Sequence, residues 1–108
     1  MSYDVYMVVD TGGTEPAYVT ESRNYTYNVS PMFRAALGGK GLNDLQGLSG
    51  AEAAVKLTSA LAFMVGHRDE MVALNPENGW GDYNGALRFL EGILEDCLKH
   101  PKAQVRIS

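Results

Sequence analysis

A strand pattern passes directly into a helix start in one stretch of this chain, Asn24-Tyr25-Thr26-Tyr27-Asn28-Val29-Ser30-Pro31. Side chains of a strand alternate between its two faces, so one face of this stretch is aromatic and apolar. The other face carries Asn24, Thr26 and Asn28 in a row. Ser30 and Pro31 are typical of a helix N-cap and a first helical residue, where the missing proline N–H does no harm. The stretch therefore predicts a junction between a sheet half and a helical half.

The segments before this stretch predict a β-hairpin. Residues 3–10 (YDVYMVVD) are rich in β-branched and aromatic residues, and residues 11–16 (TGGTEP) supply the glycines and the proline of a turn. A second strand is expected over about residues 17–29, with a bend or an interruption near residues 21–23.

Three helices are expected after the stretch. A short helix over residues 32–37 ends at Gly38-Gly39, because glycine readily adopts the left-handed conformation of a helix C-terminus. Ser49-Gly50-Ala51-Glu52 matches a capping box and predicts a helix over residues 51–67, and Asp82 is expected to cap a helix over residues 83–99. Apolar residues recur at helical spacing in both long segments, at positions 54, 57, 58 (a tolerated Thr), 61, 64 and 65 and at positions 87, 90, 93, 94, 97 and 98.

The C-terminal segment completes the predicted fold. Residues 103–108 alternate apolar and polar side chains and predict a final strand. The element order β-β-α-α-α-β predicts a single α+β domain over residues 1–108, in which helices pack on one face of a small, mainly antiparallel sheet.

Composition narrows the functional classes. Nine basic and thirteen acidic residues give a net charge of -4, which disfavours nucleic-acid binding because no positive excess neutralises the phosphates. The single cysteine, Cys97, excludes an internal disulfide and a multi-thiolate metal site. The chain has no signal-peptide pattern and no apolar run of about 20 residues, so we expect a cytoplasmic protein that does not enter a membrane. Six tyrosines suit a protein interface, and we expect a homo-oligomer.

The row of polar side chains is the first candidate binding site. Asn24, Thr26 and Asn28 can each donate and accept hydrogen bonds, which suits a neutral polar ligand, although an exposed sheet face gives the same pattern. Trp80 lies between Gly79 and Gly81 and is the second candidate, either as a stacking platform or as a plug in the core.

Other motifs give weaker evidence for a binding or catalytic role. Gly38-Gly39-Lys40-Gly41 contains glycines and a lysine that can hold phosphate, but it lacks the preceding strand and the Ser or Thr of a phosphate loop, and a helix end explains it better. His67 and His100 lie far apart in the sequence, and neither has a second histidine at helical spacing. Cys97 falls on an apolar stripe and is expected to be buried. The sequence therefore predicts no catalytic residue, no metal site and no cofactor.

A resemblance adds a biological context. Asn24-Tyr25-Thr26-Tyr27-Asn28, Gly38-Gly39-Lys40-Gly41-Leu42 and Gly47-Leu48-Ser49-Gly50-Ala51-Glu52 resemble, over about residues 24–65, a set of small uncharacterised accessory proteins of phages that infect actinobacteria. Asn24, Thr26, Asn28, Lys40 and Gly41 match that pattern. The resemblance implies a phage accessory protein that acts in the host cell on the host or its defences.

These observations favour a non-enzymatic module that binds a host protein or a small polar ligand. Its candidate binding residues are Asn24, Thr26, Asn28, Lys40 and Trp80. Two alternatives remain open: a small hydrolase or transferase that uses His67 or His100 with a carboxylate, and a virion or assembly component.

Overall fold

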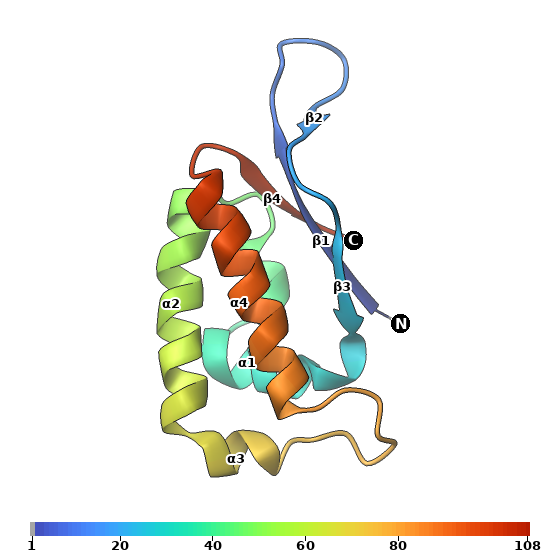
Figure 1. Ribbon diagram of the computed structural model, residues 1–108, viewed down its shortest axis with the longest axis vertical. Helices are drawn as coiled ribbons and strands as arrows, with labels where there is room; N and C mark the ends of the chain where they lie inside the picture. The colour runs from blue at the N-terminus through green and yellow to red at the C-terminus, as the bar shows by residue number, and fades with distance from the viewer. Residues whose placement is uncertain (1) are drawn as a thin grey trace.

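Strand β1 (Ser2–Val9) lies at the centre of a four-stranded antiparallel sheet in the computed structural model, which describes residues 2–108. It pairs along one edge with β2 (Ala17–Tyr18) and β3 (Arg23–Thr26), and along the other edge with β4 (Gln104–Ile107). The chain therefore brings a strand from each end of the sequence to the two sides of β1 (Figure 1).

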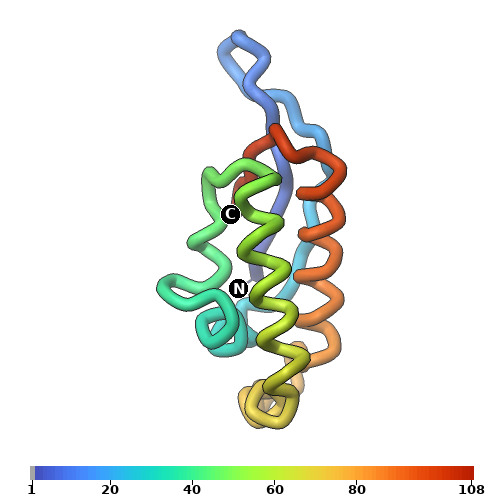
Figure 2. The backbone as a smooth tube through the Cα atoms, turned by 90° about the vertical axis from the view of Figure 1, so that its left-hand side faces the viewer, coloured from blue at the N-terminus to red at the C-terminus, as the bar shows by residue number. Residues whose placement is uncertain are grey.

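Helices α1 (Ser30–Leu37), α2 (Gly50–Gly66) and α4 (Tyr83–Lys99) cover one face of this sheet, with the strands behind them in Figure 2. Three short helices connect the larger elements: η1 (Tyr27–Val29), η2 (Gly41–Leu45) and α3 (Arg68–Val72). The predicted α+β architecture is confirmed, with 51% of the chain in helices and 18% in strands.

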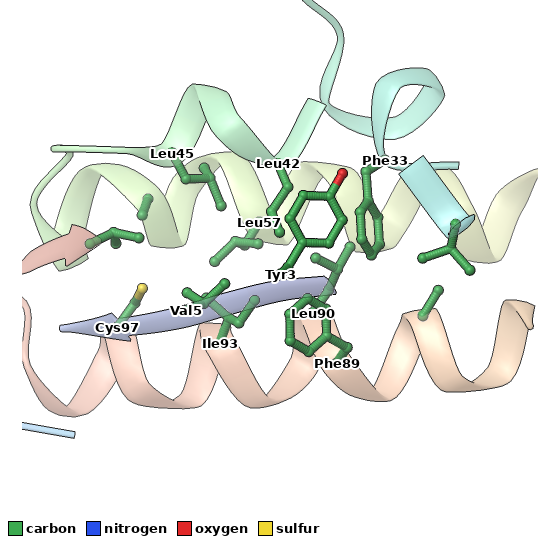
Figure 3. Packing of buried hydrophobic residues seen from close by; sticks show 14 of the residues in the cluster. Tyr3, Val5, Phe33, Leu42, Leu45, Leu57, Phe89, Leu90, Ile93 and Cys97 are labelled. Carbon is green, nitrogen blue, oxygen red and sulfur yellow. The ribbon is translucent and has the colours of Figure 1, made fainter. Parts of the chain in front are cut away.

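The core lies between the sheet and the helices. Tyr3 and Val5 of β1 point toward Leu57 of α2 and toward Leu90 and Ile93 of α4, as Figure 3 shows. All five side chains are at most 3% exposed, so this layer supplies much of the apolar burial that stabilises so small a domain.

The strand predicted over residues 17–29 is interrupted, as expected, but its predicted end is wrong, because the strand stops at Thr26. Val8 faces Tyr18 and Val5 faces Arg23, so three steps along β1 correspond to five steps along the opposite chain. The extra residues form an interruption at residues 19–22, where the Thr20 side chain accepts a hydrogen bond from Met7 N at 3.0 Å. The predicted interruption near residues 21–23 thus lies slightly earlier.

Thr26 ends the strand and begins the next helical turn. Its hydroxyl accepts hydrogen bonds from Asn28 N at 3.3 Å and Asn28 Nδ2 at 3.1 Å, which makes it the N-cap of η1. The predicted N-cap role of Ser30 is therefore wrong: Ser30 is already helical, and its hydroxyl accepts from Arg34 NH1 at 3.1 Å. Two cap signals compete within five residues, and the earlier one prevails.

The predicted caps of both long helices are confirmed, but their buried faces are rotated. Ser49 and Glu52 form the full capping box, and Asp82 accepts from Gly85 N at 2.7 Å. Val65 and Leu98, which the apolar stripes include, are each 64% exposed. Small residues take the buried positions instead, because close helix packing favours side chains such as Ala53, Ala60, Ala86 and Gly92.

Candidate functional site

Four of the five predicted binding residues line one hollow of about 570 Å³, which we call the amide hollow. It is lined by Ser2, Asn24, Thr26, Asn28, Asn78 and Trp80. These residues come from β1, β3, η1 and the connection between α3 and α4. A volume of this size falls within the range of small-molecule sites in proteins.

Internal hydrogen bonds orient the amide groups of the hollow. The two N–H groups of Asn24 Nδ2 are shared among three acceptors, Asp4 Oδ1 at 2.9 Å, Ser2 Oγ at 3.0 Å and Tyr3 O at 3.1 Å. Asn28 Nδ2 donates to Thr26 Oγ1, as described above. Among residues 2–108, neither amide oxygen has a hydrogen-bond partner. The hollow therefore offers acceptors and suits a ligand that donates hydrogen bonds.

Trp80 forms one wall of the hollow from an exposed loop. Its side chain is 68% exposed, so the alternative in which it plugs the core is wrong. Asn78 Oδ1 accepts from Trp80 N at 3.0 Å and fixes the turn before it. Gly81 has a φ of 91°, and a Cβ at this position would overlap Thr26 Cγ2. Glycine is needed here so that the loop can lie directly against the end of β3.

A tyrosine holds this loop to the sheet. Tyr25 points to the helical side of β3, where its ring lies 5.5 Å from that of Phe89 between centroids. Its hydroxyl accepts from Asp82 N at 3.0 Å and donates to Asp82 O at 3.3 Å. The position of Trp80 relative to the amide row thus depends on contacts made on the opposite face of the same strand.

Lys40 does not line the amide hollow. It lies between α1 and η2, where its backbone N–H donates to Asp44 Oδ2 at 3.0 Å and its side chain is exposed. Gly38 before it has a φ of 76° and donates its N–H to Arg34 O, so the predicted helix end at Gly38-Gly39 is confirmed.

The structure adds Asn78 and Ser2 to the site. The turn signal Asn78-Gly79 next to Trp80 could have indicated the first, because asparagine side chains commonly bind backbone N–H groups two residues on. Nothing in the sequence around Ser2 indicates its role, which depends on the pairing of Ser2 with Thr26 across the sheet.

The other reactive groups lie apart from the hollow. His67 Nδ1 lies 2.9 Å from Phe63 O and its ring stacks on Phe63, while His100 follows the last turn of α4. Among residues 2–108, neither histidine forms an ion pair or a hydrogen bond with a carboxylate. Burial raises the pKa of the Cys97 thiol to about 11, which keeps it protonated and poorly nucleophilic at neutral pH.

Comparisons with protein-family models, with curated proteins and with solved structures find no match to this chain. Within residues 2–108, no group of three His, Cys, Asp or Glu side chains is arranged to hold a metal ion. None of the helices in that range has the length and apolar character needed to cross a bilayer.

Proposed function

We propose that this chain is a non-enzymatic binding module whose ligand or partner occupies the amide hollow. One observation carries the proposal: Asn24, Thr26, Asn28 and Trp80, which lie up to 56 positions apart in the sequence, line a single hollow. A stretch of strand with incidental polar residues gives no reason for a tryptophan from another segment to lie beside it.

The chemistry of the hollow favours a ligand with hydrogen-bond donors and a flat apolar part. The oxygens of Asn24 and Asn28 accept hydrogen bonds, and the exposed Trp80 ring offers a surface for stacking. The six described residues that line the hollow are all uncharged. We therefore propose that it recognises a neutral donor, such as an amide or hydroxyl group of a small molecule or of a host protein.

The phage resemblance supplies the setting that we propose. In that setting the module acts in the host cytoplasm as a homo-oligomer. Its target there is a host protein, such as a component of host defence. Co-purification of the tagged chain from an actinobacterial host, compared with the Trp80→Ala variant, tests the protein partner. Light scattering after size-exclusion chromatography tests the oligomer.

Trp80 provides a direct assay of the hollow because it is the only tryptophan. Its emission is recorded while glutamine, uridine or N-acetylglucosamine is added at millimolar concentration. A ligand of the hollow shifts the emission with saturation, and the shift is lost in a variant with Asn24→Ala and Asn28→Ala. Asn43→Ala is the matched control, because Asn43 is also exposed but lies in η2.

The proposal is wrong if the variant with Asn24→Ala and Asn28→Ala binds every ligand with the same affinity as the unmodified protein. A urea unfolding curve of each variant separates lost binding from lost structure, since Asn24 also holds β3 to β1.

A further inference from the structure

Strand β3 has a free edge, whereas the opposite edge of the sheet is covered. On the covered side, Gly47 N donates to Val105 O at 2.8 Å and Val105 N donates to Leu48 O at 2.9 Å, so a loop closes β4. Among residues 2–108, β1 is the one strand that pairs with β3. An uncovered edge of this kind is a template for the addition of another strand.

The hydrogen-bond pattern shows which groups this edge presents. Asp4 and Ser108 exchange backbone hydrogen bonds at 2.9 and 3.1 Å on the β4 side of β1. Backbone groups alternate in direction along an antiparallel strand, so the neighbouring Tyr3 directs its groups toward its partner Tyr25 on β3.

Asn24 and Thr26 flank Tyr25 and therefore direct their backbone groups away from β1. The N–H and C=O of Asn24 and the N–H of Thr26 lie on the free edge. Asn24 is exposed and Thr26 is half-buried, so an added chain can reach both residues. The edge is short, because η1 begins after Thr26 and the interruption at residues 19–22 precedes Arg23.

A hollow lies on each face of this edge. The amide hollow occupies the outer face, where Asn24 and Thr26 point. A second hollow of about 440 Å³ lies between β3 and α4 and is lined in part by Ser22, Tyr25, Arg88 and Phe89. Asn24 lines both hollows. In a strand added to this edge, alternate side chains would enter one hollow and then the other, which is how sheet-edge sites combine affinity with specificity.

Charge and shape distinguish the occupant. Arg88 is exposed beside the edge and forms no ion pair among residues 2–108, whereas the neighbouring Arg23 is already paired with Asp96. The second hollow therefore favours a carboxylate. Because a hollow lies on each face of this edge, a single extended chain can place its side chains in both hollows.

We infer that β3 binds an extended segment of a partner protein by strand addition, with an Asp or Glu side chain directed to Arg88 and the next side chain directed to Trp80. The inference rests on the proposed function in one respect, since one of the segment's side chains occupies the amide hollow.

The test begins with a library of random linear peptides displayed on phage and selected on the purified, full-length chain. Peptides that bind are expected to carry an acidic residue, and N-methylation of their backbone is expected to abolish binding at alternate positions only. Hydrogen exchange measured by NMR is expected to slow by about tenfold or more at the N–H groups of Asn24 and Thr26 when the peptide is bound.

Thr26→Pro removes one edge N–H with little backbone strain. The φ of Thr26 is -67°, which matches proline, and its N–H points away from β1. The variant is expected to weaken peptide binding by roughly tenfold or more, because it removes a hydrogen bond and places a ring on the edge. Thr26→Val is the matched control, since it loses the same capping hydroxyl but keeps the N–H.

Arg88→Glu provides a second test that does not depend on the backbone. It is expected to weaken binding of the acidic peptide by about tenfold. Lys56→Glu, an equal charge change at an exposed position on α2, is expected to have little effect.

The inference is overturned if exchange at Asn24 and Thr26 does not slow or if the two Thr26 variants bind with equal affinity. It is also overturned if sedimentation equilibrium shows a dimer that Thr26→Pro converts to a monomer. The last result would assign the edge to a second copy. If small donors shift Trp80 emission but no linear peptide binds, this inference fails and the amide hollow remains a site. If peptides protect the edge but leave Trp80 emission unchanged, strand addition stands and the proposed use of the hollow fails.

Discussion

Replacing Gly85 by alanine tests how strand β3, helix α4 and the Trp80 loop hold one another. A Cβ at Gly85 would overlap the Tyr25 hydroxyl and lie 2.7 Å from Tyr25 Cζ. The tyrosine ring is rigid and packs against Phe89, so it has to shift as a unit. That shift breaks both hydrogen bonds between the Tyr25 hydroxyl and the backbone of Asp82.

The expected loss of stability follows from three contributions. Overpacking costs about 1–3 kcal/mol. Each broken hydrogen bond costs at most about 1 kcal/mol, and less here because water reaches the Asp82 backbone. Alanine offsets up to about 1 kcal/mol through its higher helix propensity. We therefore expect Gly85→Ala to lower the free energy of unfolding by about 2 kcal/mol, a decrease in Tm of roughly 10 °C for a domain of this size.

Urea unfolding followed by circular dichroism measures this change, and Trp80 emission reports the loop. Gly66→Ala is the matched control, because a Cβ at Gly66 in α2 has no atom within 4 Å and alanine is expected to be neutral or slightly stabilising there. The reasoning is refuted if the two alanine variants are equally stable and the Trp80 emission of Gly85→Ala is unchanged.

Three further measurements test the electrostatics. The Cys97 thiol is expected not to react with Ellman's reagent at pH 8 until urea unfolds the protein. Because the folded thiol has a raised pKa, the unfolded thiol ionises first as the pH rises, and the free energy of unfolding is expected to fall between pH 9 and about 11. This fall is expected to be smaller in Cys97→Ala. Hydrogen bonds from Ser49 lower the pKa of Glu52, so the stability that this carboxylate contributes is lost as the pH drops below about 4.5, a loss that Glu52→Gln should not show. Asp96→Asn is expected to cost about 1 kcal/mol in urea unfolding, because it weakens a two-bond ion pair with Arg23 that is partly exposed.

Local signals predicted the helix boundaries well. The capping box at Ser49 and the cap at Asp82 depend on residues within one turn of each other, and both occur as expected. Thr26 and Ser30 show the limit of such signals. Either residue can cap a helix, and the choice of Thr26 depends on where β3 stops pairing with β1, which involves residues far apart in the sequence.

The candidate site could be predicted only in part for the same reason. Alternation along a strand placed Asn24 and Thr26 on one face, and this holds because both residues are within β3. Asn28 reaches the hollow by another route, through η1 and the Thr26 hydroxyl. The presence of Trp80 there depends on the contact between Tyr25 and Asp82, and the position of Lys40 elsewhere depends on the path of the chain after α1. Neither the contact between Tyr25 and Asp82 nor the path of the chain after α1 is indicated by residues close by in the sequence.

The central position of β1 has a consequence for how the chain folds during synthesis. Val5 pairs with Arg23 on one side and with Ile107 on the other, so one neighbour follows early and the other only after α4 has been made. Until then, β1 lacks one neighbour and its core face lacks α4. Contacts between residues so distant in sequence slow folding and leave apolar segments open to aggregation. We therefore expect the nascent chain to depend on chaperones until residues 104–107 have left the ribosome, and C-terminal truncations that remove them to be degraded.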